Sequence, residues 1–228
     1  MGRPGWGACF FPPHGVDAPN RAVYNGARRF YLPLMDRLQQ ALDRFDAENA
    51  RDPNVEMAGG AGYPRELLYA RRLTDWVLKL APEASEGLRL AARCQHLCRW
   101  MIPRETQPLT RAGYLRWRNE LKQFHARRSA GILREAGYSA EMIDRVRDLN
   151  LKKNFPEDPE SRILEDALCL VFLEFQFAGL ARKTDEDKIL NAVRKTWQKM
   201  TPAARERALA LPLGAKEREL IQRALRQA

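Results

Sequence analysis

Apolar residues recur at intervals of three and four along most of the chain beyond residue 31. This spacing is typical of amphipathic helices. It predicts helices that begin near Leu34, Pro64, Ser85, Thr110, Ser139, Asp158, Thr184 and Thr201 and just after Gly214. No segment shows the alternation of a half-buried strand. The pattern therefore predicts an all-α protein, with eight or nine helices in a single helical domain.

The first 31 residues differ from the rest. They contain five glycines and four prolines and have no apolar period. We therefore expect an irregular N-terminal arm over 1–31 and a single all-helical domain over 32–228. Within that domain, one helix should run from about Ser85 to just before Pro103, and a longer one from Thr110 to Ala136, where Gly137 follows as a C-terminal signal.

Composition narrows the class of the protein and the compartment in which we expect it. The chain is 45% hydrophobic and 30% charged, which is enough apolar material for a packed core. It has no apolar run long enough to span a membrane and no secretory signal pattern. Its four cysteines are too few for a disulfide scaffold. These features favour a reduced, cytoplasmic protein without a membrane partner, and they leave the oligomeric state open.

Positive charge is concentrated in one window of the sequence. The net charge is +10, and residues 89–128 alone carry ten basic and two acidic side chains. Nine of these ten cations are arginine, which is suited to bidentate capture of phosphate or carboxylate. A solvated basic face is the alternative interpretation.

The helix predicted after Pro159 carries two adjacent carboxylates in apolar surroundings. Residues 163–180 are apolar on every side of the helical wheel, which is typical of a buried central helix. Glu165 and Asp166 near its start must therefore be paired, protonated or metal-bound, because a buried isolated charge is costly. We expect their partners among the arginines and histidines of 89–128. The alternative is an ion pair that only joins helices, and Glu174 on the same helix is expected to be structural.

Two of the three histidines lie inside the basic window. At 100° per residue, Arg89, Arg93, His96 and Trp100 would share a helix face, and His125 joins a second cationic stripe. With the two carboxylates they supply candidate general acids and bases. The candidate catalytic residues are thus His96, His125, Glu165 and Asp166. The candidate anion-binding residues are Arg93, Arg99, Arg104, Arg111 and Arg118. Each histidine alone could instead be a satisfied core residue.

Four blocks of sequence resemble the domain of unknown function 4202 family. They are LAARCQHLCRWMIPRE (90–105), RAGYLRWRNELKQFHA (111–126), ILEDALCLVFLE (163–174) and KTWQKM (195–200). The resemblance extends from about Arg37 to the C-terminus. It implies no particular activity.

The segments LAARCQH, HARRSAGILREAGY and LEDA also resemble helices of the HD superfamily of metal-dependent phosphohydrolases, which are all-helical. The resemblance implies an HD-like core, with His96 and Asp166 as ligands of a divalent metal. Two of the usual four ligands are missing, because Leu97 replaces the aspartate of the His-Asp pair and no histidine lies near Tyr69. A metal then requires a substitute ligand from His125, Glu120 or Glu165. Without one, the arginines would form a metal-free anion pocket.

The tripeptide Lys199-Met200-Thr201 partly matches a signature loop of aminoacyl-tRNA synthetases. The nucleotide-binding domain of those enzymes and its HIGH motif are absent from the sequence, so we reject a synthetase activity.

Three functions remain. The first is a phosphohydrolase-type enzyme that acts on a small phosphorylated or otherwise anionic compound. The second is a non-catalytic ligand-binding or sensor protein on a degenerate HD-like fold. The third is a nucleic-acid-binding protein, which the pI of about 9.8 permits.

Overall fold

The computed structural model describes residues 28–226 and, from Arg37 onward, their side chains. The chain divides into the units 1–35 and 36–228, and apart from the first residues of α1 (Arg28–Asn49) the features below belong to the second unit. Of the arm predicted over 1–31, residues 1–27 lie outside the described residues, while 28–31 are helical.

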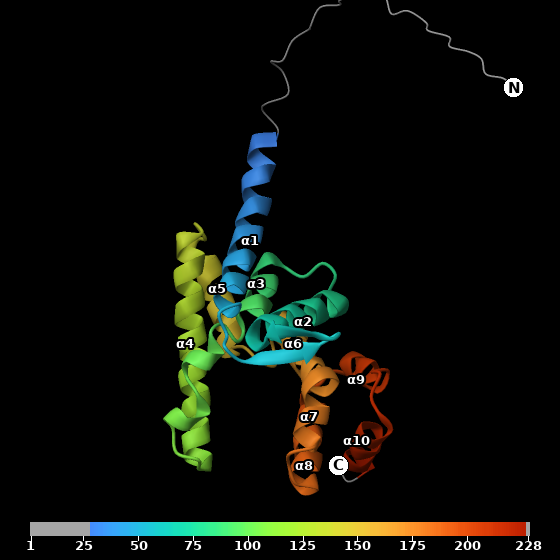
Figure 1. Ribbon diagram of the computed structural model, residues 1–228. Helices are drawn as coiled ribbons and strands as arrows, with labels where there is room; N and C mark the ends of the chain where they lie inside the picture. The colour runs from blue at the N-terminus through green and yellow to red at the C-terminus, as the bar shows by residue number, and fades with distance from the viewer. Residues whose placement is uncertain (1–27, 227–228) are drawn as a thin grey trace, which may run out of the picture. The chain divides into compact units, whose positions relative to one another are not determined.

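The described part of the chain contains ten α-helices (Figure 1). They are α1 (Arg28–Asn49), α2 (Arg65–Leu80), α3 (Glu86–Cys94), α4 (Arg111–Glu135), α5 (Ala140–Leu151), α6 (Pro159–Val171), α7 (Phe177–Ala181), α8 (Glu186–Lys199), α9 (Pro202–Leu209) and α10 (Ala215–Arg226). The helical class is confirmed. The count exceeds the predicted eight or nine because a π-helical turn, Phe172–Gln176, separates α6 from α7.

Local sequence signals fix several helix starts. The side chains of Ser85, Thr110, Ser139 and Asp158 each accept a hydrogen bond from a backbone N–H three residues later. This is the usual way in which an unpaired N–H of a first helical turn is satisfied. At the C-terminal end of α4, Gly137 has a φ of +78°, as the sequence predicted for a helix stop.

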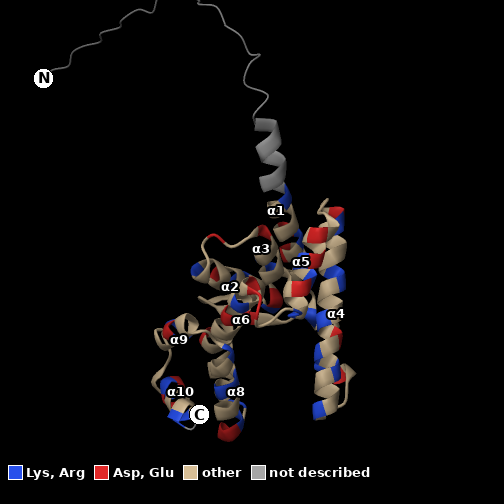
Figure 2. Cartoon of the chain, turned by 180° about the vertical axis from the view of Figure 1, so that it is seen from behind, with Lys and Arg blue, Asp and Glu red and all other residues tan. Residues whose placement is uncertain are grey.

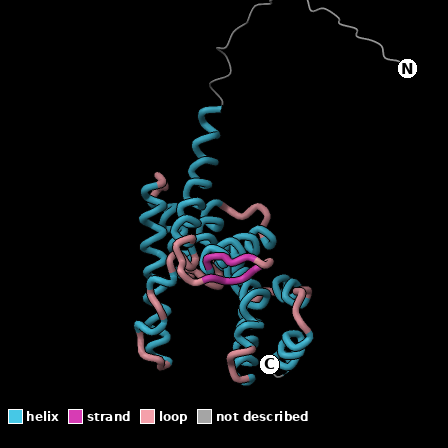
Figure 3. The backbone as a smooth tube through the Cα atoms, in the orientation of Figure 1, coloured by secondary structure: helices cyan, strands magenta, loops and turns pink. Residues whose placement is uncertain are grey.

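The expectation that the chain has no strand is wrong. β1 (Val55–Ala58) and β2 (Ala61–Pro64) form an antiparallel hairpin in which Val55 pairs with Pro64 (Figure 3). Gly59 and Gly60 both have positive φ, which suits the two-residue turn between twisted strands. The strands are short, and the side chains of Val55 and Met57 are exposed. The sequence therefore lacks the alternation of buried apolar residues from which a strand is predicted.

The helix predicted from Ser85 to Pro103 also ends early. Cys98 adopts a φ of +55°, and its backbone N–H donates to Oδ1 of Asn49 at the end of α1. The chain therefore leaves α3 at Cys94 and enters a turn. The proposed stripe through Arg93, His96 and Trp100 does not exist as one helix face, and His96 lies beyond the helix.

Helix α6 occupies the centre of the packing. It contacts α2, α3, α5, α8 and α9, and Leu164, Ala167 and Leu170 are fully buried. The three cysteines of the described region, at 94, 98 and 169, are free and buried, as small core residues are. Among the described residues, no helix combines the length and the apolar character needed to cross a membrane.

Candidate functional site

The described region contains a cavity of about 460 Å³. One wall is α4 and the other is formed by α6, the π turn, α7 and α8, while the turn after α3 and the end of α5 complete it. Figure 2 shows Lys and Arg along α4 and α8, the two helices on either side of this cavity. Its volume is within the range of small-molecule pockets.

Cations outnumber carboxylates around the cavity. Five basic side chains line it and only one acidic side chain does, Glu165. The basic residues are Arg99, Arg118, Lys122, Lys152 and Lys199. A concave surface with this excess of one charge concentrates ligands of the opposite charge.

Glu165 is buried and ion-paired. It lies against the ammonium groups of Lys152 and Lys199, the second at 3.1 Å. Burial by itself would raise the pKa of Glu165, but the two lysines outweigh burial and lower it. The carboxylate is therefore ionised at neutral pH. The expectation that its partners come from residues 89–128 is wrong, because both lysines lie outside that window.

Lys122 has no carboxylate partner in the described part of the chain. Burial lowers its pKa, and repulsion from Lys152 and Arg118 lowers it further, although attraction to the more distant Glu165 offsets part of this. A cation held beside other cations and outside ion-pair distance of any described carboxylate favours binding of an anion.

His125 is a buried, neutral imidazole. Its Nδ1 lies 2.8 Å from the carbonyl oxygen of Leu97, so Nδ1 donates and Nε2 is left as an acceptor. Burial and then repulsion from His96 lower its pKa to about 3. The ring does not carry a charge at neutral pH.

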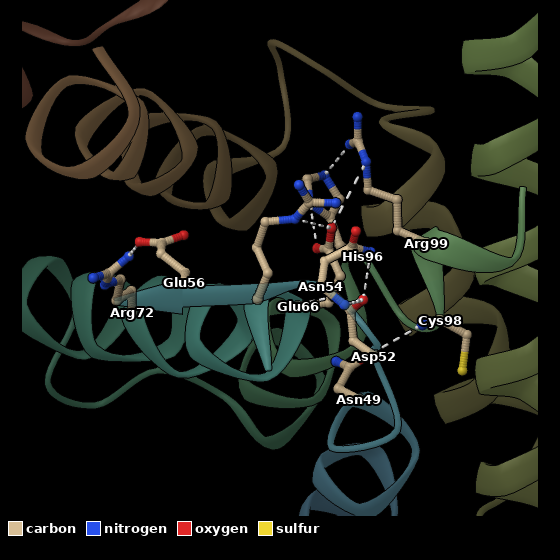
Figure 4. A network of polar contacts seen from close by, with 10 residues as sticks. Asn49, Asp52, Asn54, Glu56, Glu66, Arg72, His96, Cys98 and Arg99 are labelled. Atoms are coloured by element: carbon tan, nitrogen blue, oxygen red, sulfur yellow. Dashed lines mark hydrogen bonds and ion pairs between the residues drawn. The ribbon is translucent and has the colours of Figure 1, made fainter. Parts of the chain in front are cut away.

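His96 is held by a buried glutamate that the sequence analysis missed (Figure 4). Its Nδ1 lies 3.4 Å from Oε2 of Glu66, its Nε2 lies 3.4 Å from the guanidinium of Arg99, and its ring stacks on Tyr69 at 4.1 Å. Burial lowers the pKa of His96 despite the glutamate. Glu66 is itself fixed in the first turn of α2, where its backbone N–H donates to Asp52. An acidic residue in the first turn of a helix is common, so its position in the sequence does not indicate this role.

Irregular backbone is gathered around the cavity. Within residues 28–226, two non-glycine residues have positive φ: Cys98, which precedes Arg99, and Lys152. A lysine in this region costs on the order of 1 kcal/mol relative to glycine. The π turn likewise places Phe172 and Gln176 on the cavity wall. Strained positions and π turns are concentrated at functional sites in proteins.

The structure brings together about half of the predicted site residues. Among the candidate catalytic residues, His96, His125 and Glu165 line the cavity, and among the arginines Arg99 and Arg118 do.

The other four predicted residues do not line the cavity. Asp166 accepts hydrogen bonds from the backbone N–H and the hydroxyl of Thr201, at 2.9 and 2.6 Å. Arg93 pairs with Asp46, Arg104 donates to backbone carbonyls of its own loop, and Arg111 is exposed.

The residues present do not fit the metal centre that the HD resemblance implies. His96 lines the cavity, but Asp166 does not. Both carboxylate oxygens of Asp166 accept hydrogen bonds from Thr201. No group of three or more His, Cys, Asp or Glu side chains in the described region is placed to hold a metal ion. We therefore derive no chemical step through a metal.

The family model described as "Domain of unknown function (DUF4202)" matches residues 39–221. The chain belongs to this family. All four sequence blocks that suggested the resemblance lie within the matched residues, and so does every residue that lines the cavity. The pocket is thus part of the DUF4202 domain itself. A search of curated proteins finds no match, and neither does a search of solved structures.

Proposed function

We propose that this DUF4202 domain binds a small organic anion that carries a phosphate group. The observation that carries the proposal is the set of five cations around one cavity, facing a single carboxylate that two lysines already neutralise. An anionic ligand would relieve the repulsion among these cations. Arg99 and Arg118 supply planar donors for phosphate oxygens, and the lysines supply point charges.

The location of the cations favours a small ligand over a nucleic acid. These five side chains line a cavity of about 460 Å³. Several other arginines of the described region are paired with carboxylates, such as Arg93 with Asp46 and Arg128 with Glu48. A duplex needs a continuous basic surface, which paired arginines do not provide.

Binding is favoured over hydrolysis by the state of the histidines. A general base works best when its pKa lies near the working pH. The pKa of His125 is about 3 and that of His96 is also lowered, so both are weak bases at neutral pH. We therefore propose a ligand-binding role, with a phosphohydrolase activity as the alternative that a product assay decides.

The test is isothermal titration of the full chain with adenosine 5′-monophosphate and with inorganic phosphate, followed by an assay for released phosphate. We expect Arg118→Gln and Lys122→Gln each to weaken binding at least tenfold, because one charged hydrogen bond contributes roughly 1.5–3 kcal/mol. Arg127→Gln is the matched control, since Arg127 is an exposed cation of α4 that does not line the cavity.

Equal losses in all three variants would assign the binding to general surface charge and reject the pocket. The absence of binding by any phosphate compound would reject the proposed function. Release of phosphate that Lys122→Gln abolishes and Arg127→Gln preserves would establish the hydrolase alternative.

A further inference from the structure

The cavity has two chemically different ends. Three of its buried polar residues are uncharged: Asn150 is 2%, His125 4% and Gln95 9% exposed, whereas the buried Glu165 is ion-paired with Lys152 and Lys199. Its outer residues are cationic and reach solvent, as the 50% exposed side chain of Lys199 and the 33% exposed side chain of Arg99 show. A ligand that occupies the whole cavity meets neutral groups at one end and positive charge at the other.

The inner end carries hydrogen-bond acceptors that the protein does not satisfy. The side-chain oxygens Oε1 of Gln95 and Oδ1 of Asn150 are buried and have no hydrogen-bond partner. Nε2 of His125 is left as an acceptor, because Nδ1 makes the ring's hydrogen bond to Leu97. Buried carbonyl groups of this kind are nearly always paired in folded proteins, and an unpaired one is costly.

The orientation of the Asn150 amide follows from its neighbour. The thiol of Cys94 donates to the carbonyl oxygen of Ala91, so its sulfur is left to accept. Nδ2 of Asn150 lies 3.1 Å from that sulfur and donates to it. The oxygen of the amide must therefore point the other way, which leaves Oδ1 as the unpaired atom.

We infer that the ligand enters head first: an uncharged head with at least two O–H or N–H donors binds Oε1 of Gln95 and Oδ1 of Asn150, and its phosphate stays among the cations at the mouth. The ligand class is a phosphate monoester with a polyhydroxyl or amino-bearing head, which includes sugar phosphates and nucleoside monophosphates. This inference rests on the proposed function and adds the polarity of the ligand to it.

A donor-bearing head has a physical advantage over an apolar head of similar size. An apolar head would leave both carbonyl oxygens buried without water and without a partner. A site built to receive donors rejects an analogue that lacks them far more strongly than an apolar pocket rejects an extra hydroxyl.

Four compounds distinguish binding at the cationic end of the cavity from binding at its inner end. They are inorganic phosphate, phenyl phosphate, ribose 5-phosphate and adenosine 5′-monophosphate. By calorimetry on the full chain, we expect ribose 5-phosphate or the nucleotide to bind at least tenfold more tightly than phenyl phosphate, whose head has no donor. A gain for ribose 5-phosphate alone would indicate a sugar phosphate, and a larger gain for the nucleotide would indicate a nucleoside monophosphate.

Variants of the inner end complete the test. Gln95→Leu and Asn150→Leu should each remove most of that preference and leave the affinity for phenyl phosphate unchanged within about twofold. The matched control is Gln123→Leu, because Gln123 is an exposed residue of α4 away from the cavity and should keep the preference. If Asn150→Leu fails to fold, Gln95→Leu decides the question alone, since Gln95 lies in a turn outside the helices.

The outcomes distinguish the two proposals. Equal affinity for phenyl phosphate and the two donor-bearing esters would overturn the head-first inference and would mean that water satisfies the inner carbonyls. The proposal that the cavity binds phosphate would not be affected. A preference that survives Gln95→Leu would also overturn it. Failure of all four probes to bind would instead reject the proposed function.

Discussion

At the scale of single residues, the charges of the pocket are unequally compensated. Glu165 is buried between two ammonium groups, whereas Lys122 is partly buried beside other cations and has no carboxylate partner in the described region. The first arrangement stabilises the fold at neutral pH, and the second destabilises it in the absence of an anion. Function and stability therefore oppose each other at Lys122.

Replacing Lys122 with methionine should stabilise the ligand-free protein. The change removes an unpaired charge and keeps the long side chain, so the free energy of unfolding should rise by about 0.5–1 kcal/mol. Affinity for phosphate esters should fall in the same variant. Thermal and urea unfolding measure the first effect, with Arg127→Met as an exposed control that should change little. A loss of stability in Lys122→Met would show that this lysine has a structural partner.

Glu165→Gln should change how stability depends on pH. The folded-state pKa of Glu165 lies below its ordinary value of 4.5, so the unfolded chain binds the proton more tightly. The stabilisation is fully present above about pH 4.5 and is lost as the pH falls through the folded-state pKa. The variant should therefore be less stable than the wild type by about 1–2 kcal/mol at pH 7, a value reduced because Lys199 is half exposed. Urea unfolding should show this difference shrinking below pH 4.5, and a difference that is constant with pH would contradict the ion pair.

At the level of secondary-structure elements, two adjacent side chains of α6 make contacts in two different places. Successive residues on a helix point about 100° apart. Glu165 consequently lines the cavity, while Asp166 binds Thr201, the residue that caps the start of α9. Adjacent carboxylates that look like one catalytic pair in the sequence are thus divided between a pocket and a helix junction.

Asp166→Ala should therefore weaken the fold without weakening the ligand site. Loss of the two hydrogen bonds to Thr201 should lower the free energy of unfolding by about 1–3 kcal/mol. Affinity for adenosine 5′-monophosphate should stay within about twofold of the wild type. If binding is lost while the circular dichroism spectrum and the melting temperature are preserved, Asp166 belongs to the functional site as its sequence position suggested.

At the scale of the whole molecule, net charge and functional charge are different quantities. The chain carries +10, and many of its described arginines lie beside carboxylates, whereas Arg118 and Lys122 line the cavity without an ion pair to any described carboxylate. Net charge alone predicts weak attraction to any polyanion, whereas the cavity predicts selection of a small one.

A competition experiment separates these two effects. Duplex DNA of about 20 base pairs should not displace bound adenosine 5′-monophosphate at 0.15 M salt, because the phosphates of a duplex cannot enter the cavity. Weak binding of the duplex elsewhere on the surface would fall steeply with added salt. Displacement of the nucleotide by the duplex, with the same steep salt dependence, would support the nucleic-acid alternative.

Features that depend on neighbours along the chain could be predicted from the amino-acid sequence. Apolar spacing predicted the helices, the residues at 85, 110, 139 and 158 marked their starts, and the apolar surroundings of Glu165 predicted a buried carboxylate that needs a partner. These features follow from local hydrogen bonding and from the period of the helix, which a single sequence displays.

Contacts between residues that are distant in the sequence depend on how the helices pack. The partners of Glu165 lie 13 residues before it and 34 residues after it, and Glu66 reaches His96 across 30 residues. Beyond the end of α3, Cys98 in the following turn is bound by Asn49 of another helix, and the hairpin has no buried apolar stripe to reveal it. The spacing of charges along a sequence does not encode such contacts, because packing between helices brings them together only after the elements have formed.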